Sequence, residues 1–156
     1  MITNCYIKGR FDYGVGKCAV VIVDGAKPKE EQTIAHQAAW KVPARWEYEG
    51  TVIMADQYNC EILAAVYALQ WCLANGKGLV NLYANTTTCQ KWYMRGEFPD
   101  ERVMGDAWRD VYGKYAEHLT EEAGETVRDW FYAEYMAKKE DNEFNRLVNE
   151  LAEKVK

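Results

Sequence analysis

The segment from Ala55 to Gly76 constrains the fold more than any other part of the sequence. Its apolar residues recur at intervals of three and four positions, the spacing of an α-helix that packs on a protein core. Asp56 is placed to cap the N-terminus of this helix, and Asn75 with Gly76 provides an end signal. Apolar residues also lie off the main stripe, so we expect this helix to be buried on more than one side.

Glu61 is the one carboxylate on the core-facing side of the first turns, and it has two interpretations. An acidic side chain near the start of a helix interacts favourably with the helix dipole. A carboxylate that points toward the core can instead serve a functional site on whatever the helix packs against. The helix alone favours the first interpretation, so the decision depends on the segments around it.

Three segments with strand-like residues and turn signals precede this helix, which predicts an antiparallel meander. A strand after the helix must then be parallel to an earlier one, because a helical crossover connects parallel strands. We therefore predict an α/β fold, a five-stranded mixed sheet with three antiparallel and two parallel strands flanked by helices, in one domain over residues 1–156. The predicted strands are 4–11, 17–24, 32–42, 78–84 and 126–135, and the predicted later helices are 86–95, 101–119 and about 142–155.

Composition excludes several classes of protein. A hydrophobic content of 49% in 156 residues excludes a disordered chain, and a net charge of −5 argues against a strong general attraction to nucleic acid, although a local basic patch is compatible with it. The five cysteines form no C-x-x-C pair, and the two histidines, His36 and His118, lie far apart, so no metal site is indicated. No apolar run is long enough to span a membrane, and we expect a cytoplasmic, reduced protein without a membrane partner.

The connector from Pro43 to Ala55 is longer than such a connection requires. Trp46 and Tyr48 within it, and Trp40 just before it, are residue types that dominate binding surfaces. They are our candidates for a partner-binding surface. The alternative is that they cover the open face of the meander.

The order of elements resembles that of the ribonuclease H family, and the likeness extends from Asn4 to Val155. Lys8-Gly9 lies in the middle of the first strand, where the family has Asp-Gly. Glu61 with the small residues that follow it is similar to the family's Glu helix. Asn85 follows the fourth strand where the family has Asp-Ser, and the segment from Asn142 to Ala152 resembles the family's Asn-x-x-x-Asp-Glu-Leu-Ala ending.

The resemblance implies a site in which four carboxylates hold two divalent ions that activate a water for phosphodiester cleavage. Only Glu61 is a carboxylate here, because Lys8, Asn85 and Asn149 stand at the other three positions and Lys139 stands where the family often has a loop histidine. Hard cations prefer anionic oxygen ligands, and an ammonium group would repel them. We therefore expect a degenerate site without a metal or other cofactor.

Two neutral amides and an ammonium around one carboxylate lead to a structural prediction. Lys8 could supply the positive charge that a metal ion supplies in the family, because a lone buried carboxylate is costly. We expect its ammonium to reach Glu61 directly or through one water, with Asn85 and Asn149 completing the cluster.

The function that we prefer is a catalytically degenerate ribonuclease H-like domain that acts by binding nucleic acid or a protein partner; the sequence leaves the partner undecided. One alternative is an active ribonuclease H that uses Mg²⁺ or Mn²⁺ to cleave RNA in RNA–DNA hybrids. The other is a structural subunit of a larger assembly.

Overall fold

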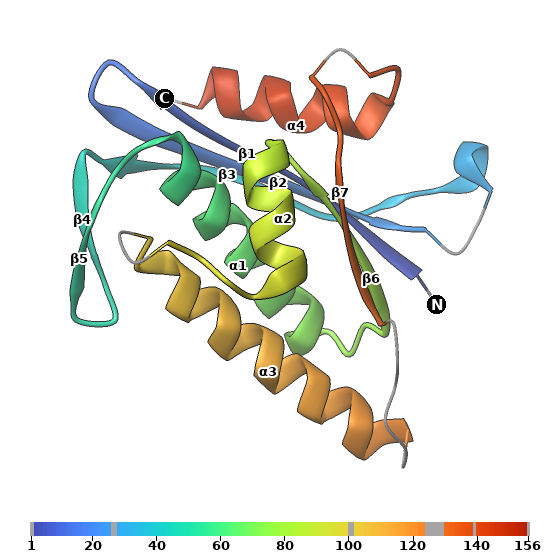
Figure 1. The fold of residues 1–156 in the computed structure, drawn as a ribbon. Helices are drawn as coiled ribbons and strands as arrows, with labels where there is room; N and C mark the ends of the chain where they lie inside the picture. The colour runs from blue at the N-terminus through green and yellow to red at the C-terminus, as the bar shows by residue number, and fades with distance from the viewer. Residues whose placement is uncertain (1, 26–27, 100–101, 124–129, 139, 156) are drawn as a thin grey trace.

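A five-stranded sheet forms the centre of the computed structural model, which describes residues 2–25, 28–99, 102–123, 130–138 and 140–155 (Figure 1). The strands lie in the order β3-β2-β1-β6-β7, with antiparallel pairs β1–β2 and β2–β3 and parallel pairs β1–β6 and β6–β7. The mixed sheet that the sequence predicts is therefore confirmed. The strands are β1 (Ile2–Asp12), β2 (Val15–Asp24), β3 (Ile34–Pro43), β6 (Leu79–Ala84) and β7 (Phe131–Tyr135).

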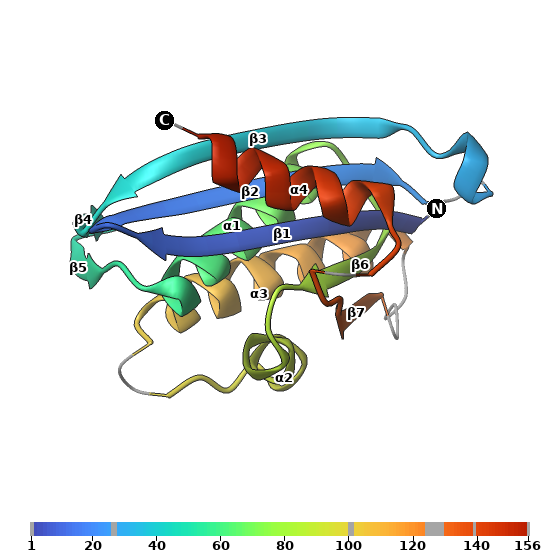
Figure 2. The ribbon, with the colours of Figure 1, turned by 90° about the horizontal axis from the view of Figure 1, so that it is seen from above.

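Helices cover both faces of the sheet. Figure 2 shows α4 across the strands on one face, with α1 and α3 on the other. The larger apolar core lies between the sheet and the helices α1, α2 and α3, and a smaller core lies between α4 and strands β1 and β2. The helices are α1 (Gln57–Ala74), α2 (Thr87–Arg95), α3 (Met104–Ala123) and α4 (Glu143–Lys154), and a short 3-10 helix spans Lys29–Glu31.

The central helix α1 forms as the sequence predicts. The Asp56 side chain caps it by accepting a hydrogen bond of 2.7 Å from the Asn59 N–H. Its small and apolar residues are buried against β1 on one side and α3 on another, which explains the apolar positions off the main stripe. This double packing fixes the direction in which Glu61 points.

Some boundaries differ from those predicted. The β1–β2 hairpin is tighter than expected, because Tyr13 and Gly14 both adopt positive φ (52° and 76°) and make the turn by themselves. Helix α3 begins at Met104 and continues to Ala123, so the predicted range of 101–119 is displaced toward the N-terminus. The first part of the predicted strand 126–135 lies outside the described residues.

The connector between β3 and α1 is a second small sheet. Strands β4 (Arg45–Tyr48) and β5 (Thr51–Met54) form an antiparallel hairpin with Glu49 and Gly50 at its turn. The sequence predicts a long connector here, and the hairpin itself was not predicted. The hairpin lies at the side of the main sheet, next to the start of α1 (Figure 1).

β1 and α1 approach each other closely at Gly9. A Cβ atom built on Gly9 would lie 2.1 Å from the backbone nitrogen of Glu61 and 2.6 Å from its Cα. Backbone cannot move away as a flexible side chain can, so only glycine fits at this contact.

We predict that Gly9→Ala lowers the free energy of unfolding by about 1–3 kcal/mol, because the added methyl group must displace α1 from the sheet. Urea denaturation measures the loss. Gly113→Ala is the matched control, since a Cβ there meets nothing within 4 Å, and alanine in a helix interior gains roughly 0.5–1 kcal/mol. A neutral Gly9→Ala would show that the close approach is not needed.

Candidate functional site

The candidate site lies where β1 and β6 run side by side and α1 begins. The parallel pairing of β1 with β6 brings Asn85, which follows β6, next to Gly9. The Gly9 N–H donates a hydrogen bond of 3.2 Å to Asn85 Oδ1. The adjacency of the Lys8 and Asn85 segments, which the resemblance requires, is thus present.

Glu61 is fully buried in this site. The Tyr93 hydroxyl of α2 donates a hydrogen bond of 2.9 Å to Glu61 Oε2, while Oε1 has no hydrogen-bond partner in the described part of the chain. Burial raises the pKa of Glu61 to about 7, against the lowering effects of Tyr93, Cys89, Thr86 and the Asn85 backbone. A substantial part of the Glu61 population therefore carries a proton at neutral pH.

Lys8 does not make the direct ion pair that we expected. Both oxygens of Glu61 are accounted for without it, one bound by Tyr93 and the other unpaired among the described residues. The reason is the alternation of a β-strand. Gly9 faces α1, so Lys8 faces α4 on the opposite side of the sheet, where its neighbour Arg10 pairs with Glu153.

The surroundings of Lys8 are cationic. Burial, followed by the charges of Lys138 and Arg10, lowers the pKa of Lys8, while Glu61 and Glu153 raise it to a lesser degree. A bridge through one water between Lys8 and Glu61 stays a prediction. Two carboxylates, Glu61 and Glu153, therefore affect the pKa of Lys8 less than burial and the neighbouring cations do.

Asn149 lies on α4, on the same side of the sheet as Lys8. Its Nδ2 donates to the Asn145 carbonyl at 2.7 Å, and its buried Oδ1 has no partner among the described residues. Asn149 shares a surface hollow with Lys138, one of the cations that act on Lys8. Lys139, the remaining predicted site residue, lies outside the described residues.

These residues do not fit a two-metal site. Within the ranges that the structure describes, no group of three or more His, Cys, Asp or Glu side chains could hold a metal ion. Asn85 Oδ1 is already used by Gly9, and Glu61 is enclosed and bound by Tyr93. One enclosed carboxylate, with an ammonium group on the opposite side of the sheet, is the wrong donor set for Mg²⁺ or Mn²⁺.

The predicted partner-binding aromatics contact the protein's own core. Trp40, Trp46 and Tyr48 are half-buried and pack against the larger core, with the ring centroids of Trp40 and Tyr67 4.8 Å apart. This packing favours the alternative that they cover the meander, and their role in binding a partner stays a prediction. The exposed apolar side chains of the hairpin include Val52 and Met54.

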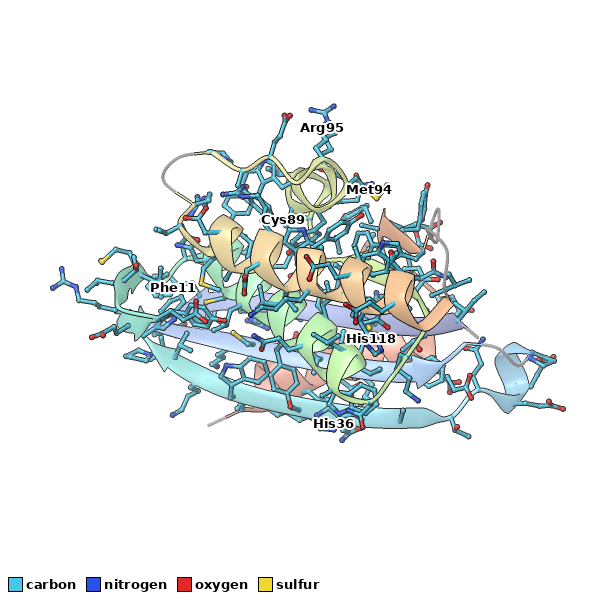
Figure 3. The ribbon with its side chains drawn as sticks, turned by 90° about the horizontal axis from the view of Figure 1, so that it is seen from below. Phe11, His36, Cys89, Met94, Arg95 and His118 are labelled. Atoms are coloured by element: carbon cyan, nitrogen blue, oxygen red, sulfur yellow. The ribbon has the colours of Figure 1, made fainter. Side chains whose placement is uncertain are left out.

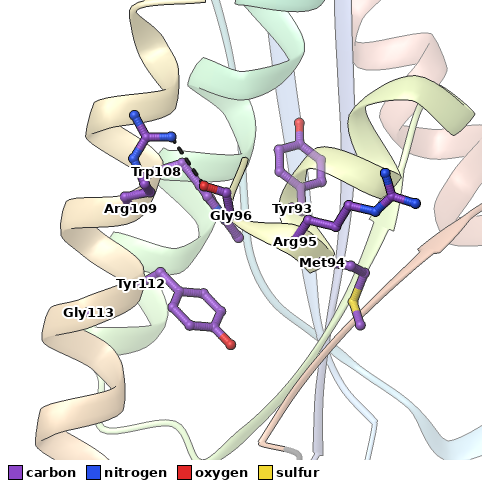
Figure 4. A pocket seen from close by; sticks show the side chains of 8 residues that line it. All are labelled: Tyr93, Met94, Arg95, Gly96, Trp108, Arg109, Tyr112 and Gly113. Atoms are coloured by element: carbon purple, nitrogen blue, oxygen red, sulfur yellow. Dashed lines mark hydrogen bonds between the residues drawn. The ribbon is translucent and has the colours of Figure 1, made fainter. Parts of the chain in front are cut away.

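A separate pocket of about 200 Å³ lies between α2 and α3 (Figure 4). Trp108 and Tyr112 of α3 form one wall, and the Arg109 guanidinium donates to the Gly96 carbonyl at 3.2 Å. Tyr93 contributes to this pocket as well as to the Glu61 site. The pocket contains none of the residues that the sequence predicts for the site.

The histidines lie on different elements, as Figure 3 shows for His36 on β3 and His118 on α3. His36 Nε2 is 2.7 Å from the Tyr67 hydroxyl and its ring stacks on Trp71. His36 is therefore held in place by two aromatic side chains of α1. None of the helices that the structure describes has the length and apolar character needed to cross a membrane.

The sequence analysis missed Tyr93, which is the hydrogen-bond partner of Glu61. Tyr93 lies four residues after Cys89 and seven after Thr86, so the three side chains share one face of α2. That spacing was a usable signal, because a tyrosine on the buried face of a helix needs a partner for its hydroxyl.

Comparison with solved structures supports the fold that the resemblance implied. RNase H1 from the archaeon Halobacterium salinarum matches with a TM-score of 0.67 at 14% identity, over 98% of this chain and 96% of that one. The N-terminal RNase H domain of a Mycobacterium tuberculosis protein, solved as a fusion with maltose-binding protein, gives a TM-score of 0.69 at 8% identity, covering 99% of this chain and 98% of that one. LC11-RNase H1 in complex with an RNA/DNA hybrid gives 0.57 at 15% identity, with 97% of both chains covered. The fold is ribonuclease H-like.

No protein-family model matches the sequence, and no curated protein is significantly similar to it. At these identities the structural likeness concerns the fold. What the site does must be argued from its own residues.

We predict that Glu61→Gln changes the pH dependence of stability. The raised pKa means that the folded state keeps a proton that the unfolded state releases between about pH 4.5 and about pH 7, so the wild type loses stability over that range. Glutamine does not titrate, so the free energy of unfolding of the variant should rise relative to that of the wild type as pH rises, by roughly 3 kcal/mol at most. Urea denaturation at several pH values measures the difference.

Glu153→Gln provides a control of opposite sign. The Lys138 hydrogen bond and charge lower the pKa of the exposed Glu153 carboxyl, so its contribution is lost as pH falls. The free energy of unfolding of Glu153→Gln should therefore decrease relative to that of the wild type as pH rises. A difference between Glu61→Gln and wild type that is constant across pH would contradict the account of Glu61.

Proposed function

We propose that this protein is a catalytically degenerate ribonuclease H-like domain that binds nucleic acid through the Lys8 end of its sheet without cleaving it. The observation that carries the proposal is the inverted charge of the site. One enclosed carboxylate, Glu61, remains, and Lys8, a half-buried cation without an ion pair among the described residues, lies across the sheet from it.

The charge at the site supports binding of an anion. In the ribonuclease H family, metal ions offset the negative charge of the bound phosphodiester. Here Lys8 offers positive charge in the same region. Lys138 and Arg10 are close enough to lower its pKa, and both pair with Glu153. A protonated Glu61 would remove one of the two carboxylate charges that act on Lys8, the other being that of Glu153, and its pKa near 7 makes that protonation accessible.

The structural neighbours support nucleic acid as the ligand. LC11-RNase H1 and a foamy viral protease–reverse transcriptase were both solved with RNA/DNA hybrid, the latter with a TM-score of 0.56 at 15% identity, over 97% of this chain and 19% of that one. The negative net charge of this protein confines such binding to a local surface. We therefore place the contact at the Lys8 end of the sheet.

The alternative functions require different features of the structure. An active, metal-dependent ribonuclease H needs carboxylates that the described site does not supply. A purely structural subunit needs no cation at Lys8. A protein-binding domain would use a surface such as the β4–β5 hairpin, where Val52 and Met54 are exposed. The half-buried Lys8 is explained best by an anionic ligand.

We predict that a blunt, fluorescently labelled RNA–DNA hybrid binds equally well in Mg²⁺ and in EDTA, because no metal ion takes part. Lys8→Gln should weaken this binding about tenfold, the effect of one charge-assisted hydrogen bond. It should also reduce the slope of log affinity against log salt by roughly 1. Fluorescence anisotropy measures both effects.

Lys8→Arg is the matched control, since it keeps the charge and should keep most of the affinity. Circular dichroism of both variants confirms that they fold. Binding that requires Mg²⁺, or binding that Lys8→Gln leaves unchanged, would contradict the proposal.

A further inference from the structure

A row of cations crosses the three antiparallel strands near the β1–β2 turn. Arg10 on β1 lies directly opposite Lys17 on β2, and Lys17 lies directly opposite Lys41 on β3. Directly paired residues of a sheet point to the same face, and like charges in such pairs are destabilising. Three in succession therefore need an explanation other than stability.

The described structure supplies anions for Arg10 but not for the two lysines. The Arg10 guanidinium pairs with Asp12 at 2.8 Å and with Glu153 at 3.2 Å. Lys17 and Lys41 take part in no ion pair within the described residues, although the protein as a whole has an excess of acidic side chains. Lys17 and Lys41 thus stand at directly opposed positions of the sheet without an ion-pair partner in the described part of the chain. The two carboxylates at the same hollow, Asp12 and Glu153, both pair with Arg10.

The end of α4 extends this surface. Lys17 and Lys41 line a hollow of about 470 Å³ together with Lys154, the last residue of α4. Figure 1 shows the C-terminal end of α4 beside the turn between β1 and β2. Lys154 is also favoured there by the helix dipole, so the argument rests on the cross-strand pair, and Lys154 adds to its charge.

Tyr13 supplies an aromatic ring at the same place. It lines the hollow, its side chain is fully exposed, and it sits at positive φ in the two-residue turn. An exposed aromatic ring beside cations is the combination that binds single-stranded nucleic acid, because a ring stacks on an unpaired base while the cations hold the backbone. An acidic peptide would use the lysines but would gain less from the ring.

We propose that the β1–β2 turn surface, formed by Arg10, Lys17, Lys41, Lys154 and Tyr13, binds the phosphodiester backbone and a base of single-stranded nucleic acid. It lies beside the degenerate site, since Lys8 and Arg10 share one face of β1. The inference rests on the proposed function in one respect, namely that the single strand continues from a duplex held at Lys8. It adds to the proposed function the single-stranded form of the nucleic acid and the residues that bind it.

The test compares a blunt RNA–DNA hybrid with the same hybrid carrying a single-stranded oligothymidine extension at either end. The wild type should bind one extended form at least fivefold more tightly than the blunt form. Lys17→Gln/Lys41→Gln should abolish this advantage while leaving blunt binding within twofold of wild type. Tyr13→Ala should remove part of the advantage, and Lys114→Gln, an exposed lysine of α3 that pairs with Asp110, should remove none.

Stability gives a second readout that a structural role of the lysines would not produce. Relief of like-charge repulsion should raise the thermal midpoint of Lys41→Gln above that of wild type at low salt, with the difference shrinking as salt is added. Gain of stability with loss of binding is the expected signature. A lowered midpoint at low salt would show that Lys41 supports the fold and would overturn the inference.

The two proposals fail separately. If the blunt hybrid binds but neither extension adds affinity, or if the double variant keeps the advantage, the inference is wrong and the proposed function stands. If the blunt hybrid does not bind but oligothymidine alone binds and is released by Lys17→Gln/Lys41→Gln, the surface is confirmed and the proposed function fails. Equal competition by an oligoglutamate peptide of matched charge would overturn the assignment to nucleic acid.

Discussion

The close approach of α1 to β1 at Gly9 determines the geometry of the site. The backbone of Glu61 occupies the space that a side chain at Gly9 would need, so the helix and the strand are fixed relative to each other at this point. The Glu61 carboxylate reaches α2, where the Tyr93 hydroxyl donates to it. Asn85 is held in the same region by the Gly9 N–H.

Because of this geometry, Glu61 and Lys8 lie on opposite sides of the sheet, although we expected them to form one cluster. Glu61 approaches from the α1 side and is enclosed among uncharged groups, which raises its pKa, whereas Lys8 extends on the α4 side among Arg10 and Lys138, which lower its own. A buried carboxylate that can take up a proton and, on the other side of the sheet, a half-buried cation are the features on which the proposed binding of a phosphodiester rests. The donors required for metal-assisted cleavage are absent from its described residues.

Much of the fold could be predicted because its signals are local. The periodicity and capping of α1, the turn residues of the meander and the order of elements determine the sheet. Contacts between side chains of different helices and strands were harder to predict. The Lys8–Glu61 ion pair was wrong because the sequence shows only that the residues are near, and strand alternation decides on which face each lies. Tyr93 and the Lys17–Lys41 pairing were missed because they depend on helix rotation and strand register.

The proposed function is that this ribonuclease H-like domain holds an RNA–DNA hybrid without cutting it. The most direct test divides one binding reaction, prepared with Mg²⁺ or Mn²⁺, between a native gel and a denaturing gel. The account predicts a shifted complex in the first gel and full-length RNA in the second, for wild type and Glu61→Gln alike. Shortened RNA with the wild type and intact RNA with Glu61→Gln would contradict it, and would show that Glu61 still serves a working metal site.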